Sequence, residues 1–381
     1  MKRNTSKSLK RVWKTKVEMK IGIITYHCSN NYGAQLQAYA TCHFLHKLGY
    51  EAEVIDCNTI GKGPIFMWSC DNIRSVLGSI RNNLLSLVSE RKRHKLFEDF
   101  SRNRIGISKP CYTRQELENA CKKYDYVITG SDQVWHPMIC EGHTYFFLDL
   151  PIPNYRKIAY APSFGVSEYT QDEVDKYMPL IKEIDHLSVR EDSGRKLIKK
   201  YTGRDAKIVV DPTMLLSKAD WNKIAIPAKY SKYLFYFTIL DEPEGTDELV
   251  RRIAKEKGLK IVRIGTVRDI MKIGFINARA NGPQQFLGLV RDADFVVTTS
   301  FHGSVFSILY EKQFLCILNN NDRNSRMETL LGNLGLKNRM VKDVNNFNID
   351  NDVPIDYKAV NAKLNVIRKD SVNFLKDSIS D

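Results

Sequence analysis

The sequence predicts an α/β protein with two doubly wound parallel sheets that face each other across a cleft. Short apolar runs alternate with helix-like segments along both halves of the chain, which is the pattern of parallel sheets covered by helices. The 381 residues are more than one ordinary hydrophobic core accommodates. The passage 216–232, which contains Pro227, reads as the linker between two Rossmann-like domains.

These features divide the rest of the chain into four further segments. A basic extension is expected at 1–19, and the N-terminal domain at 20–215. The C-terminal domain is expected at 233–356. The charged, amphipathic segment 357–381 is expected to form a final helix.

The N-terminal half opens on a β-α-β unit. The run KIGIITY (20–26) has the apolar character of a buried strand, and EAEVIDC (51–57) is the next strand. Between them, apolar residues recur at helical spacing from Leu36 to Phe44. Segment 58–115 shows broken periodicity, and we expect helices there. Further strands are expected at 124–130, 157–163, 186–191 and 207–213.

The C-terminal half repeats the alternation. Strands are expected at 233–240, 260–265, 294–299 and 314–318, and helices at 246–257, 284–291 and 303–310. In an open parallel sheet of this kind, ligands bind beyond the carboxyl ends of the strands, where loops meet helix N-termini. Site residues are therefore expected in the loops at those ends.

Composition narrows the class of protein. Hydrophobic residues make up 43% and charged residues 27%, as in soluble globular proteins. No apolar run approaches the roughly 18–20 residues that span a bilayer, and the basic start lacks a signal-peptide core. The eight cysteines are scattered without a CxxC pair, so neither a metal site nor a disulfide frame is expected. A cytoplasmic protein is favoured.

The charge is strongly positive. Lys and Arg number 58 against 44 Asp and Glu, which gives +14 and favours anionic partners. The first 20 residues hold eight Lys or Arg and one Glu. This segment is either a solvated tail or, with Trp13 and Val17, a peripheral membrane contact. No nucleic-acid-binding motif is present, and no nucleic-acid partner is expected.

Two loops of the N-terminal half are candidate binding loops. The polar turn after the first strand enters a helix, where backbone amides favour an anion and a glycine allows close approach; an ordinary helix cap is the alternative. Its candidate residues are Asn31, Tyr32, Gly33 and Gln35. The run GSDQVW follows the third strand, with candidates Ser131, Asp132, Gln133 and Trp135. Trp135 offers a stacking platform for a sugar, or it lies in the core.

Cationic and proton-donating candidates come from three further places. Arg190 ends a strand and provides a fork for carboxylate or phosphate, unless it forms a plain ion pair with Glu191 or another acid. The loop after FVVTT offers Ser300, His302, Gly303 and Ser304 as an anion seat with a proton donor. Arg323 and Arg326 follow in the same half. GxGxxG, P-loop, HExxH and GxSxG motifs are absent, which argues against the enzyme classes that use them.

Taken in order, these loops resemble those of the polysaccharide pyruvyl transferase family. The resemblance covers about residues 20 to 335 and is carried by IGIITYHCSNNYGAQLQAYA, VITGSDQVWHP, IAYAPSFG, SVREDSG, VVDPTMLL, GPQQFLGLVRDADFVVTTSFHGSVFSILYEKQF and SRMETLL. It implies a GT-B-like fold and transfer of an enolpyruvyl-derived group from phosphoenolpyruvate, the co-substrate, to a sugar. The usual product is a pyruvate ketal, and no cofactor or metal is implied.

The sequence departs from the family pattern at one position. Some members carry an arginine, an apolar residue and a histidine where this chain has Ser300, Phe301 and His302. The histidine carries over and the arginine does not. The hypothesis is that Arg326 or Arg323 supplies the missing positive charge.

The resemblance also implies roles for the candidates. His302 is expected to be the acid, with Arg190 and Arg326 on the anionic groups and Asp132 as base for the sugar on the N-terminal, acceptor side. The acceptor is expected to be lipid-linked, with the basic extension docking at the inner membrane face. The rivals are a GT-B glycosyltransferase that uses a nucleotide sugar and a non-catalytic binder of acidic glycans or membranes.

Overall fold

The computed structural model describes residues 19–27, 29–57, 73–239, 242–266, 269, 272–319, 324–348 and 353–380, with only the backbone of 73–86. The expected basic extension falls almost wholly outside the described residues, and so does Arg323. Within the part of the chain that is described, no helix combines the length and the apolarity that crossing a membrane requires.

The first half folds into a six-stranded sheet in which every strand pair is parallel. The order is β2-β1-β3-β4-β5-β6. The strands are β1 (Lys20–Ile24), β2 (Glu51–Val54), β3 (Tyr126–Thr129), β4 (Lys157–Ala159), β5 (His186–Val189) and β6 (Lys207–Ile208). Most side chains of β1, β3, β4 and β5 are buried, because helices cover both faces of the sheet, whereas the edge strands β2 and β6 have exposed residues such as Glu51 and Lys207.

The helices of this half follow their strands. They are α1 (Tyr32–Lys47), α2 (Ile73–Arg104), α3 (Arg114–Cys121), α4 (Gln171–Lys182) and α5 (Asp192–Thr202), with short 3₁₀ turns η2 (Thr144–Phe147), η3 (Asn154–Arg156) and η4 (Pro212–Met214). Helices were expected within 58–115, and α2 and α3 begin there. Thr113 and Glu116 form a capping box that starts α3, and Thr170 and Glu173 do the same for α4.

The second half forms another all-parallel six-stranded sheet, in the order β12-β11-β10-β7-β8-β9. Its strands are β7 (Tyr233–Phe237), β8 (Lys260–Ile264), β9 (Ile276–Asn277), β10 (Phe295–Thr298), β11 (Phe314–Ile317) and β12 (Met340–Val341). Its helices are α6 (Lys218–Asn222), α7 (Thr246–Glu256), α8 (Pro283–Arg291), α9 (Phe301–Leu309) and α10 (Ser325–Leu334), with the 3₁₀ turn η7 (Lys337–Arg339) and the long α11 (Tyr357–Ser380). The prediction of two doubly wound parallel sheets is confirmed.

Strand order places the site. In the first sheet the order reverses between β1 and β3, and in the second between β7 and β10. At such a reversal the following helices lie on opposite faces of the sheet, which leaves a crevice at the carboxyl ends of the two strands. The candidate loops after β1, β3 and β10 start at these crevices. The two crevices meet at the seam between the domains.

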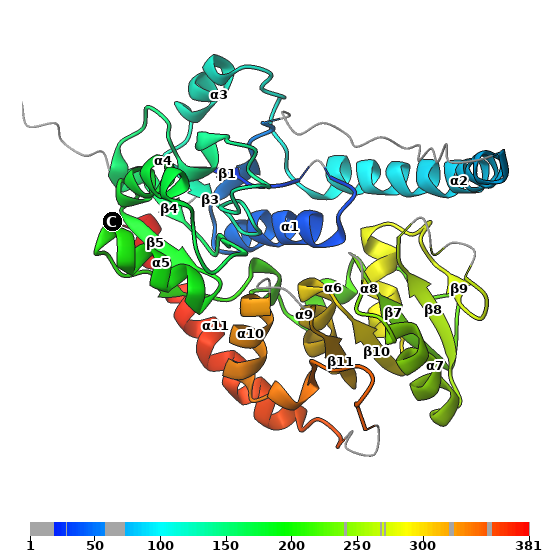
Figure 1. The fold of residues 1–381 in the computed structure, drawn as a ribbon. Helices are drawn as coiled ribbons and strands as arrows, with labels where there is room; N and C mark the ends of the chain where they lie inside the picture. The colour runs from blue at the N-terminus through cyan, green and yellow to red at the C-terminus, as the bar shows by residue number, and fades with distance from the viewer. Residues whose placement is uncertain are drawn as a thin grey trace, which may run out of the picture.

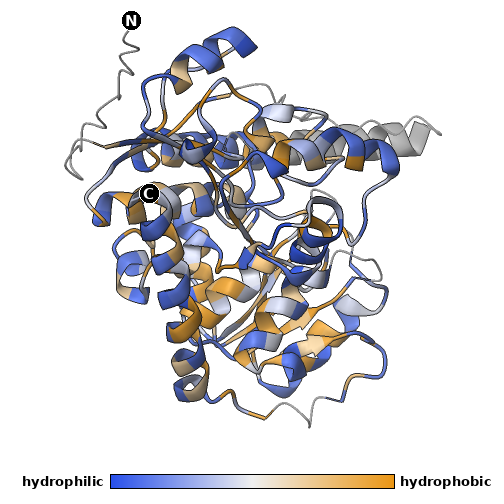
Figure 2. Ribbon diagram, turned by 90° about the vertical axis from the view of Figure 1, so that its left-hand side faces the viewer, coloured by the Kyte–Doolittle hydropathy of each residue, from blue (hydrophilic) through white to orange (hydrophobic). Residues whose placement is uncertain are grey.

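The seam is well packed. One continuous set of buried apolar residues includes side chains of both sheets. Tyr32 of α1 stacks on Phe286 of α8 at 4.8 Å between ring centroids, and its hydroxyl donates to the carbonyl of Asn281 at 2.7 Å. Glu90 of α2 pairs with Arg279 of the second domain at 2.5 Å. Figure 2 shows hydrophobic segments gathered inside the domains and hydrophilic segments on the outer helices.

The last helix connects the domains a second time. Figure 1 shows α11 running from the lower domain back to the upper one, where the chain ends. On the way, Ser371 Oγ accepts a hydrogen bond from Val210 N at 3.0 Å, and Arg368 Nε donates to the carbonyl of Met214 at 2.5 Å. These contacts tie β6 and η4 to the helix, so the end of β6 is held close to the seam.

Candidate functional site

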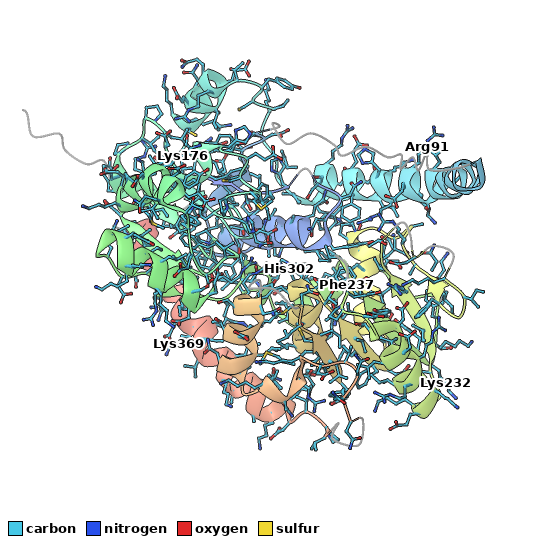
Figure 3. All side chains as sticks on the ribbon, in the orientation of Figure 1. Arg91, Lys176, Lys232, Phe237, His302 and Lys369 are labelled. Atoms are coloured by element: carbon cyan, nitrogen blue, oxygen red, sulfur yellow. The ribbon has the colours of Figure 1, made fainter. Side chains whose placement is uncertain are left out.

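A pocket of about 110 Å³ lies at the seam, where the loops after β3 and β10 and the first turns of three helices converge. It brings together six residues that the sequence had singled out: Asn31, Asp132, Gln133, Ser300, His302 and Arg326. Ile239, Thr299, Phe301, Asn319, Asn324 and Met327 complete the lining and were not predicted. Figure 3 places His302 near the centre of the molecule, between the two domains.

Three helices begin at the pocket. The N-cap residues of α1, α9 and α10 are Asn31, Ser300 and Asn324, and all three line it. Asn31 Oδ1 accepts from the amide of Gly33 at 2.9 Å, and Ser300 Oγ accepts from the amide of Gly303 at 3.3 Å. The positive ends of the three helix dipoles are therefore directed at one small volume, which favours an anion.

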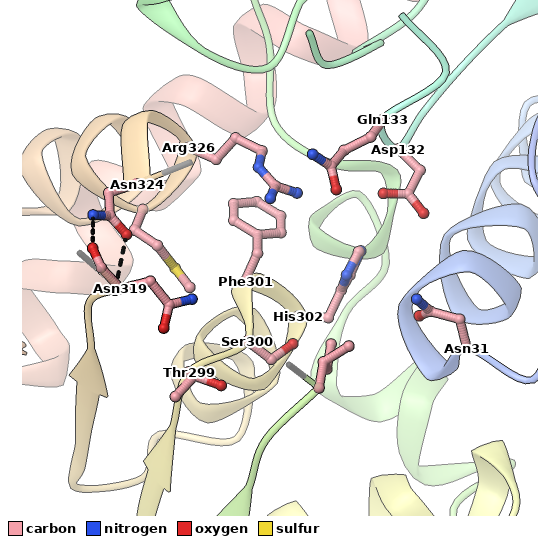
Figure 4. A pocket seen from close by; sticks show the side chains of 12 residues that line it. Asn31, Asp132, Gln133, Thr299, Ser300, Phe301, His302, Asn319, Asn324 and Arg326 are labelled. Atoms are coloured by element: carbon pink, nitrogen blue, oxygen red, sulfur yellow. Dashed lines mark hydrogen bonds between the residues drawn. The ribbon is translucent and has the colours of Figure 1, made fainter. Parts of the chain in front are cut away.

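His302 lies in the first turn of α9, because that helix begins two residues before the expected start at 303. Only 5% of the residue is exposed, and its Nε2 lies 3.5 Å from Oδ2 of Asp211, an ion-pair distance without hydrogen-bond geometry. The imidazole packs edge to face on Phe301 at 5.3 Å. Its ring lines the pocket (Figure 4).

Gly33 of α1 covers the other side of this imidazole. A Cβ at Gly33 would lie 2.1 Å from Nδ1 of His302, far closer than two such atoms approach. The glycine is therefore needed for the contact between α1 and the histidine across the seam. A ligand contact is not required to explain it.

Replacing Gly33 with alanine should displace His302 from the pocket and reduce kcat/KM for a reaction that uses this imidazole by at least about 100-fold, since a shift near 1 Å at a reacting group has that cost. Steady-state kinetics measures this. Gly332→Ala is the matched control, because Gly332 also lies within a helix and a Cβ there meets its nearest atom, Lys337 Cε, at 3.4 Å. Gly332→Ala should retain activity. Full activity in Gly33→Ala would contradict the required position of the imidazole.

Arg190 lies behind the pocket and not in its lining. Its Nη1 pairs with Asp211 Oδ2 at 2.6 Å and its Nη2 with Asp132 Oδ1 at 3.4 Å. Burial would lower the pKa of Arg190, but these two carboxylates outweigh burial and raise it. The ion-pair alternative is thus the observed state, with Asp211 and Asp132 as partners in place of Glu191. The guanidinium also lies 4.5 Å from the Phe301 ring centroid.

Asp211 is the residue that sequence reasoning missed. It follows β6 and is 1% exposed, and its Oδ2 faces both Arg190 and His302. Thr213 holds Oδ1 through its amide at 3.0 Å and its hydroxyl at 2.6 Å. Burial alone would raise the pKa of Asp211. Its interactions with His302, Arg190 and the Thr213 hydroxyl outweigh burial and hold the pKa of Asp211 well below its usual range.

A signal for Asp211 is present in the sequence. The motif VVDPT places an acid directly after an apolar run, as with the other strand-end candidates, and a proline follows it. Because its partners Arg190 and His302 lie far away along the chain, only the fold shows that the acid belongs to the site.

Two residues of the GSDQVW loop lie away from the pocket. Trp135 is fully buried, its Nε1 donates to the carbonyl of Phe146 at 3.0 Å, and its ring stacks on Phe147. The suggested stacking platform for a sugar is therefore wrong, and the core alternative is correct. Ser131 is also buried, and its Oγ bonds to Ala161 O at 2.9 Å and Asp211 Oδ2 at 3.2 Å. It supports Asp211 instead of a ligand.

Four more candidates serve packing. Tyr32 belongs to the aromatic contact across the seam described above. Gln35 Nε2 donates to the carbonyl of Ser29 at 3.4 Å. Gly303 is needed because a Cβ there would lie 2.2 Å from Thr298 Oγ1, so α9 packs tightly on β10; Ser304 is fully buried. These side chains do not line the pocket.

Arg326 is the cation that does line the pocket. It lies in the first turn of α10, and its guanidinium carbon is 5.8 Å from the Phe301 ring centroid. Figure 4 shows Arg326 above Phe301, with Gln133 and Asp132 across the pocket. Among the described residues, no group of three or more His, Cys, Asp or Glu is arranged to hold a metal ion.

Comparison with solved structures finds full-length resemblance at low identity. A putative UDP-N-acetylglucosamine 2-epimerase from Listeria monocytogenes matches with a TM-score of 0.48 and 10% identity, over 95% of this chain and 89% of that one. The UDP-GlcNAc 2-epimerase of Methanocaldococcus jannaschii gives 0.45 and 11%, over 92% and 93%. The E. coli heptosyltransferase WaaC with ADP gives 0.41 and 10%, over 93% and 99%.

The sequence comparisons are more specific. No curated protein matches the chain. The family model for polysaccharide pyruvyl transferase matches residues 31–321, a span that contains five of the six predicted pocket residues and ends before Arg326. This match covers well over half of the chain, and it includes the loops after β3 and β10 that form the pocket. The chain therefore belongs to the polysaccharide pyruvyl transferase family.

Proposed function

We propose that the chain transfers the pyruvyl group of phosphoenolpyruvate to two hydroxyls of a sugar, forming a ketal and releasing phosphate. The observation that carries this proposal is the small pocket at three helix N-termini, lined by Arg326 and His302. Phosphoenolpyruvate has a phosphate and a carboxylate on a three-carbon frame. Such a compact anion needs fixed amides and cations close together.

Pocket size favours this donor over a nucleotide sugar. Sites for drug-sized ligands enclose about 300–1,000 Å³, whereas this pocket encloses about 110 Å³. The proposal therefore ranks a nucleotide-sugar glycosyltransferase second.

The chemistry assigns each step to a residue. His302 donates a proton to the methylene carbon, which leaves an oxocarbenium-like centre at C2. The first sugar hydroxyl bonds to C2 and gives its proton to a base, and the C2–O bond to phosphate then breaks. The second hydroxyl closes the ketal, and its proton leaves on phosphate. Asp132 is the one carboxylate lining the described pocket, and we propose it as the base.

We propose Arg326 as the replacement for the arginine missing at Ser300. Arg326→Met should raise the KM for phosphoenolpyruvate by about 10- to 100-fold, because a hydrogen bond to a charged group is worth about 1.5–3 kcal/mol. The KM of Arg326→Lys for phosphoenolpyruvate should lie between those of Arg326→Met and wild type. Initial rates at varied phosphoenolpyruvate measure the effect, and Arg291→Met, at the end of α8 with its partner Asp292, is the control. An unchanged KM would favour Arg323 instead.

The proposed activity is tested directly by incubating the chain with phosphoenolpyruvate and a panel of lipid-linked sugars and p-nitrophenyl glycosides. Phosphate release and the mass of the added pyruvyl group on the sugar report turnover. Uridine and guanosine diphosphates in a thermal-shift assay separate the alternatives. Stabilisation by a nucleotide without turnover of phosphoenolpyruvate would favour the glycosyltransferase, and no response to any donor would favour a binding protein.

We also propose that the acceptor is carried on a lipid and that the basic segment 1–19 holds the enzyme at the inner face of the cytoplasmic membrane. The support is charge: the first 20 residues contain eight Lys or Arg and one Glu. Co-sedimentation with anionic vesicles should be weaker after deletion of 1–19. Equal co-sedimentation of the two chains would remove this part of the proposal.

A further inference from the structure

The loop that carries Asp132 and Gln133 rests on a second loop, residues 162–165, here called the support loop. Ser163 N donates to the carbonyl of Asp132 at 2.8 Å, and Trp135 N donates to the carbonyl of Ser163 at 3.3 Å. Gly165, at φ +65°, lies so close to Gln133 that a Cβ there would be 2.1 Å from Nε2. The positions of both pocket side chains therefore depend on the support loop.

Hydrogen bonds to Glu191 hold the support loop in place. Its Oε1 accepts three hydrogen bonds, from Ser163 Oγ at 3.1 Å, Phe164 N at 2.8 Å and Gly165 N at 3.3 Å. One oxygen of one side chain thus restrains three consecutive residues.

Stability alone does not account for a glutamate at this position. Glu191 is fully buried, and its Oε2 has no hydrogen-bond partner among the described residues. A buried carboxylate oxygen without a donor costs free energy. Glu191 also follows Arg190 directly, and Arg190 N donates to the carbonyl of Pro162 at 3.3 Å. The segment that pairs with Asp211 is therefore the one that fixes the support loop.

We propose that Glu191 is a positioning residue for the acceptor sugar. Through the support loop it fixes Asp132 and Gln133 on the N-terminal side of the pocket, and it touches neither substrate. The sugar in this proposal rests on the proposed function. The hold of Glu191 on the loop does not, and it is measured separately below.

Three variants test this. Glu191→Leu removes the side-chain oxygen that accepts the three hydrogen bonds, whereas Glu191→Gln retains an amide oxygen there. Ser163→Ala removes one of the three hydrogen-bond donors and leaves the Glu191 carboxyl group in place. Glu168→Gln is the control, since Glu168 is exposed on the surface. Hydrogen–deuterium exchange of peptides spanning 162–166 measures how firmly the backbone of the support loop is held. The sugar is followed by the KM for the p-nitrophenyl glycoside that wild type converts fastest. Binding of phosphoenolpyruvate is followed by its Kd, measured by calorimetry.

Glu191→Leu should speed exchange in the support loop and raise the glycoside KM by about tenfold or more, with the Kd for phosphoenolpyruvate within about twofold of wild type. Glu191→Gln and Ser163→Ala should shift both readouts in the same direction by less, and they carry the test if the leucine variant does not fold. If Glu191 had a purely structural role, its replacement would weaken the binding of both substrates equally.

Equal weakening of the two substrates, or unchanged exchange in 162–166, would overturn the assignment. A wild-type chain that does not turn over phosphoenolpyruvate would refute the proposed function and with it the sugar. The exchange measurement would still show whether Glu191 holds the loop. The two failures are therefore distinguishable.

Discussion

Replacing His302 with glutamine should reduce kcat by roughly 10²–10⁴-fold, the usual contribution of a positioned general acid. Glutamine occupies a similar volume and retains a hydrogen-bond donor, but it cannot deliver a proton to carbon. The Kd for phosphoenolpyruvate should change much less than kcat, because Arg326 and the three helix ends remain. Single-turnover measurement of phosphate release, together with calorimetric binding, separates the two effects.

A second measurement identifies the proton. In deuterated water the product should carry one solvent deuterium in its methyl group, since the third hydrogen of that methyl comes from the acid. His46→Gln is the control; His46 is exposed at the end of α1, and its Nε2 bonds to the carbonyl of Ala52 at 2.9 Å. A His302→Gln enzyme with wild-type kcat would exclude this histidine as the acid.

The parts of this fold that could be predicted are those that depend on residues close together in the sequence. Apolar runs that end in polar or glycine residues mark strands, and the loops after β1, β3 and β10 were expected at a ligand site for that reason. The pocket contains candidates from each of these loops, for example Asn31, Asp132 and Ser300. Strand order was not needed to find them.

The sequence did not predict which side chains of a correctly chosen loop point into the pocket. Asp132 and Gln133 face the pocket, whereas Trp135 turns into the core against Phe147 and Phe164. A tryptophan near a site has both options, and packing around it decides. Glycines misled in the same way: Gly33 and Gly303 are required by close contacts within the protein, and those contacts form only after folding.

Buried charge pairs were the other omission. Arg190 and Asp211 are both almost completely buried, and each makes the other tolerable there. Local sequence contains no sign of such pairing, because Arg190 follows β5, Asp211 follows β6, and the third member, His302, comes from the other domain. The result is that the acid behind the imidazole could not be assigned, although its motif had been noticed.

Replacing Asp211 with asparagine should both destabilise the chain and inactivate it. Removal of one partner leaves Arg190 buried with Asp132 at 3.4 Å as its remaining carboxylate partner, and breaking a buried pair costs about 3–5 kcal/mol. His302 also loses the carboxylate that faces its Nε2. Urea denaturation followed by tryptophan fluorescence measures the stability. Lys47, exposed on the surface, has its own ion pair with Asp220, and Lys47→Met serves as a surface-pair control.

The effect of pH has a definite sign. The pKa of Asp211 is lower in the folded chain than the ordinary value near 4. Ionised Asp211 therefore stabilises the fold above that ordinary value, and the stabilisation is lost as pH falls toward the folded-state pKa. The stability difference between wild type and Asp211→Asn should narrow as the pH falls below about 4.

A double variant separates stability from catalysis. In Arg190→Met/Asp211→Leu both charges are absent, so neither is left unpaired, and the loss of stability should be smaller than the sum of the single losses. Activity should stay absent, because the carboxylate facing His302 is still missing. If the double variant recovered turnover together with stability, the pair would be structural only, and the imidazole would not depend on Asp211.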